Sequence, residues 1–268
     1  MAKEPQSRIE EFIRLCEQQD YFQDQKLIVD ELIQDGTVNQ CWVIRSGENK
    51  YLARLGRELP ENLFTDWQKE IKINQFSAQL GLSAEAIFVD EPNLSALYPW
   101  CGEPLKPEDI TDIAISQLGE KLGLLHVTDS PTSAIGYRQT IESYLHLIEE
   151  KSGAEIALPF VTELLELAGL WDQSTEKCFC HHDLHPGNVL WDGNSCTLID
   201  WEYSRLAHPL FDLASLSYYF QLSDPQLSLL LKSYKGSPYT TKQIRAAEHM
   251  VVGLEKLWYT ATKFTLKN

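Results

Sequence analysis

Residues 178–203 read CFCHHDLHPGNVLWDGNSCTLIDWEY, and this stretch places three polar side chains at defined spacings. Asp183 lies in a polar loop, and Asn188 follows five residues later, after a Pro-Gly pair. An apolar pair then leads to the turn at 192–194, and a second apolar run leads from that turn to Asp200. Because two short apolar runs around an Asp-Gly turn are typical of a hairpin, we expect Asn188 and Asp200 to meet at one end of two paired strands.

These three side chains suit the transfer of a phosphoryl group. The amide oxygen of Asn188 and the carboxylate of Asp200 would give Mg²⁺ two hard oxygen ligands, with water and phosphate oxygens completing the octahedron. Asp183 could accept the proton of an attacking hydroxyl group. Phosphoryl transfer depends on positioning and charge neutralisation more than on covalent chemistry, so this short set can suffice.

The pattern His181-x-Asp183-x-x-x-x-Asn188, followed by Ile199-Asp200-Trp201-Glu202, resembles the catalytic core of the aminoglycoside phosphotransferase and choline kinase superfamily. Its members are small-molecule relatives of the protein kinases. The string LIDWEY is most similar to the choline, ethanolamine and thiamine kinase branch. The resemblance implies an α+β, protein-kinase-like two-lobed fold, with a small antiparallel-sheet N-lobe and a larger, mainly helical C-lobe. It implies ATP and Mg²⁺ as cofactors, Asp183 as the catalytic residue, and Asn188 and Asp200 as the metal ligands.

Further nucleotide-binding residues follow from the same resemblance. The turn at 35–39, which includes Gly36, Thr37 and Asn39, is similar to the family's phosphate-covering turn, although Asp35 stands where a second glycine is common. Arg54 matches the basic residue that binds the nucleotide phosphates, and the guanidinium fork suits phosphate oxygens. A surface strand residue is the ordinary alternative for Arg54.

Two more positions complete the implied nucleotide site. Glu70 matches the acidic partner of the basic residue, with a surface helix carboxylate as the ordinary alternative. Residues 97–102, which include Tyr98 and Trp100, match the hinge whose backbone groups hold adenine.

The rest of the chain fits this organisation. Gly47 leads a hairpin with expected strands at 38–45 and 51–55, short apolar runs follow at 86–89 and 94–98, and 26–33 reads as either strand or helix. Helical periods predict helices at about residues 5–19, 61–80, 108–127, 138–151, 157–171, 210–222, 224–234 and 241–264. Three prolines mark a linker at 99–107, so we expect a nucleotide-binding lobe at 1–99 and a helical lobe, with the catalytic loop and acceptor site, at 100–268.

Composition narrows the class of partner. The 268 residues carry a formal charge of −16, which disfavours a nucleic-acid partner because phosphate binding needs a basic surface. No apolar stretch is long enough for a membrane helix and no secretory signal is present, so no membrane partner and a cytoplasmic location are expected. The acidic charge would attract a cationic small molecule, or it serves solubility alone.

Several side chains near the motif keep more than one interpretation. We expect His181 to support the loop, whereas His185 supports it or approaches the phosphates. Glu202 reaches a second metal ion or the substrate, or it is a solvated charge at a strand end. Trp201 and Trp258 are candidates for holding a cationic acceptor through cation–π attraction, with core packing as the alternative.

The sequence therefore predicts an ATP-dependent phosphotransferase that phosphorylates a hydroxyl of a small, cationic, choline- or thiamine-like molecule. An aminoglycoside or another small molecule is the alternative acceptor. Only eleven residues separate Asp200 from Asp212, which leaves little room for a peptide-docking segment. Two hypotheses belong to other classes: a nucleotide-binding pseudokinase, and a zinc protein that uses the crowded cysteines and histidines. The zinc hypothesis names Cys178, Cys180, His181, His182 and His185.

Overall fold

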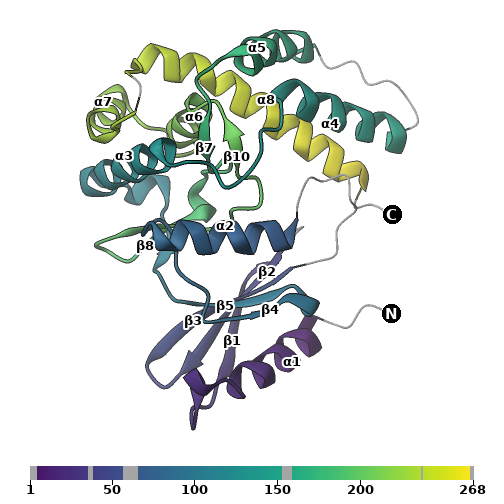
Figure 1. The fold of residues 1–268 in the computed structure, drawn as a ribbon, viewed down its shortest axis with the longest axis vertical. Coiled ribbons are helices and arrows are strands. Elements are labelled where there is room, and N and C mark those ends of the chain that lie inside the picture. The colour runs from purple at the N-terminus through teal and green to yellow at the C-terminus, as the bar shows by residue number, and fades with distance from the viewer. Residues whose placement is uncertain (1–4, 36–38, 57–65, 153–158, 237, 266–268) are drawn as a thin grey trace. The chain divides into compact units, whose positions relative to one another are not determined.

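The computed structural model describes residues 5–35, 39–56, 66–152, 159–236 and 238–265. Within it the chain forms two compact units, residues 1–102 and residues 103–268 (Figure 1). The helices and strands of the first unit are α1 (Pro5–Glu17), β1 (Ile28–Asp35), β2 (Asn39–Ser46), β3 (Asn49–Gly56), α2 (Trp67–Gln79), β4 (Phe88–Asp90) and β5 (Ser95–Pro99), with 3₁₀ turns η1 (Asp20–Phe22) and η3 (Glu91–Asn93).

The first unit is built on one antiparallel sheet with the strand order β1-β2-β3-β5-β4. The segment that the sequence left open between strand and helix is strand β1. The expected glycine-led hairpin is β2–β3, and Gly47 makes its turn with a φ of 57°, a left-handed conformation that glycine adopts without steric cost.

Each face of this sheet has its own hydrophobic core. Side chains alternate between the two faces of a strand, so Trp42 and Ile44 on β2 pack with the buried face of α1, which includes Phe12. The opposite face of the sheet, including Leu52, packs with Ile71 of α2. Helix α2 begins at its N-cap Asp66, whose carboxylate accepts a hydrogen bond from the Lys69 amide at 3.1 Å.

The second unit is mainly helical. Its helices and strands are β6 (Glu103–Pro104), α3 (Asp112–Val127), α4 (Tyr137–Ser152), α5 (Val161–Gln173), β7 (Cys178–Cys180), β8 (Val189–Trp191), β9 (Cys196–Leu198), β10 (Arg205–Ala207), α6 (Leu210–Tyr219), α7 (Asp224–Ser233) and α8 (Thr241–Thr265), with 3₁₀ turns η4 (Pro107–Asp109) and η5 (Pro186–Asn188).

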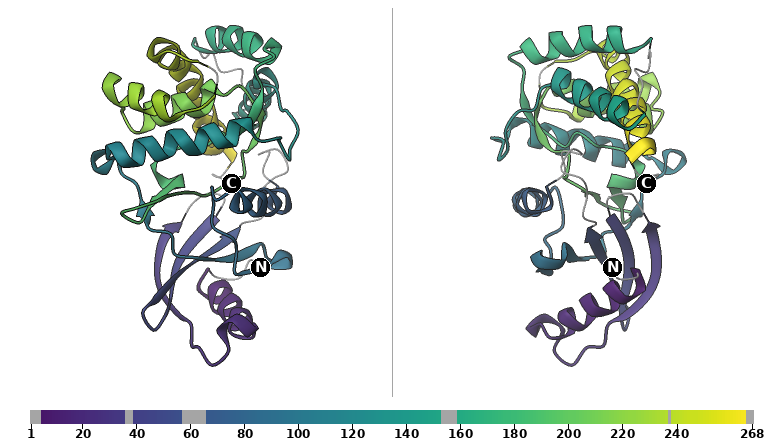
Figure 2. Two further views of the ribbon diagram at one scale, coloured as in Figure 1. Left: turned by 60° about the vertical axis from the view of Figure 1, so that its left-hand side comes forward. Right: turned by 90° about the vertical axis from the view of Figure 1, so that its right-hand side faces the viewer.

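Helix packing in this unit fixes the position of the functional loop. The long helix α8 packs against α4, α5 and α6, and α3 packs against α7 (Figure 2). Helices α3 and α7 approach closely because Gly119 has no side chain: a Cβ there would lie 2.5 Å from the Leu230 carbonyl oxygen. Helix α3 also contacts β7, the strand that leads directly into the loop at 181–188.

Two small antiparallel sheets flank this loop. Strands β7 and β10 pair before and after it, and β6, β8 and β9 form the second sheet. The β8–β9 hairpin is the one predicted from the Asp-Gly turn. The predicted α+β fold, with a small antiparallel sheet followed by a mainly helical unit, is confirmed.

The predicted helix boundaries differ from the observed ones by a few residues, and parts of two predicted helices, 61–65 and 157–158, lie outside the described residues. Among the helices in the described part of the chain, none is long and apolar enough to cross a bilayer.

Candidate active site

Asp183 and Asn188 are joined by two hydrogen bonds within the loop. The side-chain amide of Asn188 donates to the Asp183 carboxylate at 2.8 Å and to the Asp183 carbonyl oxygen at 2.9 Å. The side chain of Asp183 is 28% exposed, while Asn188 is buried. Because Asp183 takes the N–H groups of the amide, the amide oxygen of Asn188 is the atom left to meet a cation.

The hairpin places Asp200 next to Asn188. Val189 pairs with Leu198, and the amide of Ile199 donates to the Asn188 carbonyl oxygen at 3.1 Å, so the chain reaches Asp200 at the end of the hairpin that begins at Asn188. Asp200 has a φ of 67°, in the left-handed region that Asp tolerates better than most residues because its short polar side chain can hydrogen-bond locally.

The two residues fit a magnesium ion. A carboxylate and an amide oxygen are hard ligands, and Mg²⁺ in phosphoryl-transfer sites takes one or two carboxylates together with waters and phosphate oxygens. The side-chain N–H groups of Asn188 donate to Asp183, and this fixes the orientation of the amide. The amide oxygen is then available to coordinate the ion. Asn188 and Asp200 would hold Mg²⁺, which would neutralise charge on the phosphates.

Asp183 lies in a strongly acidic environment. Burial and, after it, the carboxylate of Asp200 raise the pKa of Asp183 to about 8, against the hydrogen bond from Asn188, which lowers it. Asp212 and Glu255 also raise this pKa. A carboxylate with a raised pKa is a stronger base than a solvated one, which suits a group that takes a proton from a hydroxyl.

Asp212, at the start of α6, holds the backbone of the loop. Its carboxylate accepts hydrogen bonds from the amides of His181 and His182, both at 2.8 Å, and its side chain is fully buried. His126 of α3 completes the arrangement, with Nε2 at 3.1 Å from the Asp212 carboxylate. The sequence prediction did not assign Asp212 or His126 to the site.

His181 and Trp201 support the loop through buried contacts. His181 donates from Nε2 to the Ile199 carbonyl oxygen at 3.0 Å, and burial lowers the pKa of its imidazole, so the ring is neutral. The ring of Trp201 lies 4.5 Å from that of His181 and has no exposed surface. In this position Trp201 packs in the interior, which is the core-packing alternative that the sequence left open.

His182 connects the loop to Arg205 on β10. Its Nε2 lies 2.8 Å from the Arg205 guanidinium, and its ring stacks on Phe211 with centroids 3.8 Å apart. Arg205 also donates to the Thr140 hydroxyl at 2.9 Å and lies over the ring of Tyr137. Because His182 faces a permanent cation, its ring accepts this hydrogen bond as a neutral imidazole.

His185 remains compatible with both of its predicted roles. Its Nδ1 accepts a hydrogen bond from the Gly187 amide at 3.0 Å, which supports the turn before Asn188. Its Nε2 lies 3.7 Å from the carboxylate of Asp183, and its ring is half-buried. The side chain therefore supports the loop while one ring nitrogen lies beside the candidate base.

Aromatic and acidic side chains from the segment after Asp200 and from helices α6 and α8 are electrostatic neighbours of Asp183 or contact those neighbours. Trp258 donates from Nε1 to the Tyr203 hydroxyl at 3.0 Å, and the Tyr219 hydroxyl donates to Glu255 at 3.2 Å. Glu202 is buried, and its carboxylate helps to raise the pKa of Tyr203. The sequence prediction included Glu202 and Trp258 but not Glu255, which lies on α8 far along the chain.

Arg54 and Glu70 form a buried ion pair within the first unit. The guanidinium of Arg54 on β3 bonds the carboxylate of Glu70 on α2, with only 8% and 4% of the two side chains exposed. The two residues meet because Arg54 lies on the sheet face that packs against α2. This is the pairing that the resemblance implied.

The other predicted nucleotide-binding residues belong to the turn at 36–39 and to the segment at 98–100. Asn39 begins β2 and is buried, whereas Gly36 and Thr37 lie outside the described residues. Tyr98 is a buried residue of β5, and the amide of Trp100 donates to the Lys50 carbonyl oxygen at 3.3 Å.

The five residues of the zinc hypothesis do not gather around one point. The three histidines bond elsewhere: His181 to the Ile199 carbonyl, His182 to Arg205, and His185 to the Gly187 amide. Only Cys178 and Cys180 lie together, with their sulfur atoms 3.5 Å apart.

Comparison with known proteins defines the class. A model of the phosphotransferase enzyme family matches residues 31–245, so the chain belongs to this family. Protein LicA of Haemophilus influenzae is 33% identical over 94 residues, which cover 34% of this chain and 35% of LicA. The rat acyl-CoA dehydrogenase family member 11 is 32% identical over 213 residues, which cover 69% of this chain and 27% of that protein. The chain spans about a third of the length of these curated relatives, or less.

Solved structures share the fold. Choline kinase LicA from Streptococcus pneumoniae has a TM-score of 0.75 at 18% identity, covering 97% of this chain and 92% of that one. A choline/ethanolamine kinase family protein from Mesorhizobium loti has a TM-score of 0.72 at 20% identity, with coverage of 94% and 85%. Spectinomycin phosphotransferase, in complex with ADP and spectinomycin, has a TM-score of 0.64 at 17% identity, with coverage of 93% and 86%. These likenesses establish the kinase-like fold. The family match over residues 31–245 confirms the phosphotransferase family that the motifs indicated.

Proposed function

We propose that this protein is an ATP- and Mg²⁺-dependent phosphotransferase that phosphorylates a hydroxyl group of a small cationic molecule, of the size and charge of choline or thiamine. The observation that carries the proposal is the loop at 181–188 with the hairpin behind it. Asp183 is bonded to Asn188, and the backbone pairing of Asn188 delivers Asp200 beside it. A base and two hard metal ligands are the groups that phosphoryl transfer to a hydroxyl needs.

Each residue has one proposed task. Asp183 orients the acceptor hydroxyl and takes its proton as the oxygen attacks the terminal phosphorus of ATP, while the bond from that phosphorus to the bridging oxygen breaks and ADP leaves. Asn188 holds the Asp183 carboxylate in place through its side-chain amide at 2.8 Å and offers its oxygen to Mg²⁺ together with Asp200. Bound Mg²⁺ supplies charge neutralisation on the phosphates. Asp212 keeps the loop backbone in position through the amides of His181 and His182.

The first unit is proposed to bind the nucleotide. Arg54 would contact the phosphates while the buried carboxylate of Glu70 fixes its guanidinium. The turn that includes Gly36, Thr37 and Asn39 would cover the phosphates. Tyr98 and Trp100 would lie at the adenine, where backbone groups of the hinge make the contacts. Solved structures with this fold include LicA in complex with AMP.

The proposal of a cationic acceptor rests on the groups around Asp183. Glu202 and Glu255 supply negative charge, and Tyr203, hydrogen-bonded to Trp258, supplies aromatic surface near Asp183. Aromatic faces attract ammonium groups, and a desolvated contact contributes about 2 kcal/mol. Choline and ethanolamine kinases are among the structures that share the fold.

An aminoglycoside is the second candidate acceptor. Aminoglycosides carry several ammonium groups, so the same carboxylates would attract them, and spectinomycin phosphotransferase shares the fold with a TM-score of 0.64. Choline-type and aminoglycoside acceptors differ in size, so one assay separates them.

The test is ATP consumption with Mg²⁺ against choline, ethanolamine, thiamine and a set of aminoglycosides. We expect turnover on one class of acceptor, and a loss of about 10²- to 10⁴-fold in kcat for Asp183→Asn, the size expected for removal of a general base. Nucleotide binding should persist in this variant. Asp192→Asn is the matched control, because Asp192 lies in the exposed turn of the same hairpin.

Two outcomes would contradict the proposal. Asp183→Asn with nearly normal kcat would remove Asp183 as the base. ATP binding without turnover on any acceptor would favour a nucleotide-binding pseudokinase.

A further inference from the structure

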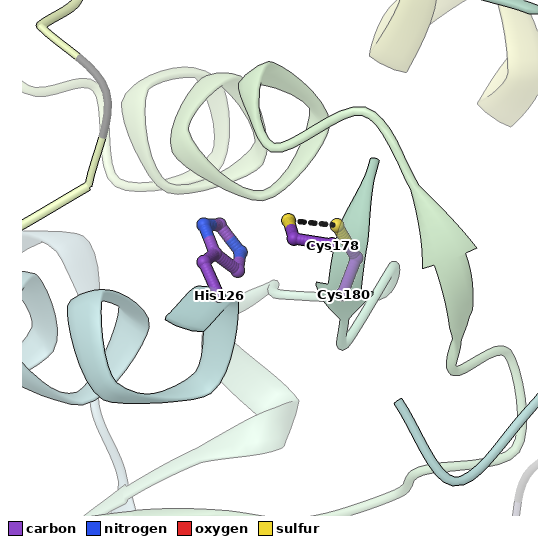
Figure 3. Close-up of side chains that lie close together, drawn as sticks. All are labelled: His126, Cys178 and Cys180. Carbon is purple, nitrogen blue, oxygen red and sulfur yellow. Dashed lines mark hydrogen bonds between the residues drawn. The ribbon is translucent and has the colours of Figure 1, made fainter. Parts of the chain in front are cut away.

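Three side chains with metal-binding chemistry lie together in the second unit, outside the proposed active site. Cys178 and Cys180 are two residues apart on β7, so their side chains point to the same face of the strand, and their sulfur atoms are 3.5 Å apart. The ring of His126, on α3, lies beside them (Figure 3). The ligand atoms of the three residues all lie within 4.8 Å of one another.

We propose that His126, Cys178 and Cys180 form a binding site for a borderline or soft divalent cation such as Zn²⁺. Sulfur and imidazole nitrogen are the ligands that Zn²⁺ prefers, whereas Mg²⁺ takes oxygen. The site is therefore chemically distinct from the oxygen ligands Asn188 and Asp200.

The spacing of the sulfur atoms matches tetrahedral coordination. With a Zn–S bond of about 2.3 Å, the tetrahedral angle puts two thiolate sulfurs about 3.8 Å apart. Cys178 and Cys180 are within a few tenths of an ångström of that separation without any movement of β7. Three protein ligands leave the fourth position of the tetrahedron for a water molecule or another small ligand.

The charges of the proposed site balance. Two thiolates and one neutral imidazole around a divalent ion have no net charge, so the loaded site can be buried at low electrostatic cost. The ligands bind the ion as two thiolates and a neutral imidazole, so any proton on these ligand atoms leaves to solvent as the ion binds. Cys180 and His126 are buried while Cys178 is half-buried, so the Cys178 side is the route by which an ion would enter.

The surroundings hold the ligands in position. The two ring nitrogens of His126 lie 2.8 Å from the Tyr234 hydroxyl and 3.1 Å from the Asp212 carboxylate. In metal sites the second ring nitrogen of a ligand histidine usually bonds such an oxygen, which fixes the ring. When the metal binds, one of the two ring nitrogens would exchange its hydrogen bond for the metal ion, and the other would keep its hydrogen bond. In the free site the Cys180 thiol donates to the Ala207 carbonyl oxygen on β10 at 3.6 Å, and this bond is lost when the thiolate binds the ion.

The test uses the full-length protein and Co²⁺ as a spectroscopic probe, followed by competition with Zn²⁺. A thiolate-to-cobalt charge-transfer band should appear and saturate at one equivalent, and Zn²⁺ should abolish it. Cys178→Ser and Cys180→Ser should each weaken Co²⁺ binding at least tenfold. Cys101→Ser, matched to half-buried Cys178, and Cys196→Ser, matched to buried Cys180, should leave the affinity unchanged.

A second measurement needs no variant. X-ray absorption of the Zn²⁺-loaded wild type should give two sulfur ligands and at least one imidazole nitrogen. Absence of a thiolate band with Co²⁺, a band unchanged in both Cys178→Ser and Cys180→Ser, or a Zn²⁺ shell of oxygen and nitrogen alone would overturn the proposal. These measurements do not depend on phosphotransferase activity.

Discussion

The carboxylate of Asp212 accepts a hydrogen bond from the amide of His182 at 2.8 Å, and His182 has a φ of 68°. A left-handed conformation costs a residue other than glycine about 1–3 kcal/mol. The Asp212 bond offsets that cost, because the amide of His182 would otherwise be buried without this partner. Helix α6 thus holds the backbone immediately before Asp183 in a conformation that it would not adopt alone.

Asp212→Ala should therefore destabilise the fold and disorder the loop. It leaves the buried amides of His181 and His182 without their acceptor, at about 1–3 kcal/mol for each amide. Chemical denaturation should show a loss of about 2–6 kcal/mol for the two amides together, along with a fall in kcat. Asp129→Ala removes an exposed carboxylate and should change stability by less than about 0.5 kcal/mol. Equal stability of the two variants would contradict this account of Asp212.

The buried, neutral ring of His182 should make the free energy of unfolding depend on pH. Burial, with the neighbouring guanidinium of Arg205, holds the pKa of His182 well below its usual 6.5. Below pH 6.5 the unfolded chain takes up a proton that folded His182 rejects, so this residue's contribution to stability is present above pH 6.5 and is lost as the pH falls. The slope approaches about 1.4 kcal/mol per pH unit for one proton.

Comparison with His182→Asn isolates this contribution, because Asn tolerates the left-handed conformation and keeps an acceptor oxygen. Tyr137 and Phe211, which also face the ring, stay uncharged in this range. Denaturation between pH 5 and 7 should show a flatter dependence for His182→Asn than for the wild type. His146→Asn, at an exposed position of α4, should keep the wild-type slope.

The sequence predicted the parts of the site that depend on local structure. The hairpin between Asn188 and Asp200 follows from an Asp-Gly turn between two apolar runs. Contacts made by helix packing could not be read in the same way. Asp212 reaches the loop amides only because α6 packs behind it, and His126 reaches Cys178 only because α3 packs against β7. No fixed separation along the sequence signals either contact.

The burial of Trp201 shows a related limit. An aromatic residue beside a metal ligand fits both a substrate cage and a core. The alternation of the strand does not decide between them here, because the chain after Asp200 leaves the hairpin with a left-handed turn. In the structure the ring packs on His181 and Phe179.

Glu70→Gln tests the buried ion pair of the first unit. Breaking a buried pair from one side leaves a guanidinium without its carboxylate, at about 3–5 kcal/mol. In the same sheet Arg45 bonds Asp30 on the surface, where the Arg45 side chain is 44% exposed and the Asp30 side chain 38%. Asp30→Asn should therefore lower the free energy of unfolding by less than about 1 kcal/mol. Urea denaturation of the two variants measures the difference.

The double variant Arg54→Met/Glu70→Leu separates structure from binding. Apolar side chains of similar volume often replace a buried ion pair without loss of stability. We expect stability near that of the wild type but weakened ATP binding, measured by calorimetry, because the phosphate contact is gone. Undiminished ATP affinity in the stable double variant would remove Arg54 from the nucleotide site.

Trp258 and Tyr203 give the sharpest test of the acceptor side. The indole N–H of Trp258 bonds the Tyr203 hydroxyl at 3.0 Å, so one ring holds the other beside the acidic groups around Asp183. A cation–π contact contributes about 0.5–2 kcal/mol, so Trp258→Leu should raise the KM of a cationic acceptor about 2- to 30-fold and leave the KM of ATP unchanged. Tyr259→Leu is the matched control, since the adjacent ring on α8 is 61% exposed. Tyr203→Phe keeps an aromatic face but loses the hydrogen bond to Trp258. Its KM for the acceptor should lie between those of Tyr259→Leu and Trp258→Leu. If Trp258→Leu raised the KM values of ATP and acceptor equally, or if Tyr259→Leu matched its effect, Trp258 would not contact the cation.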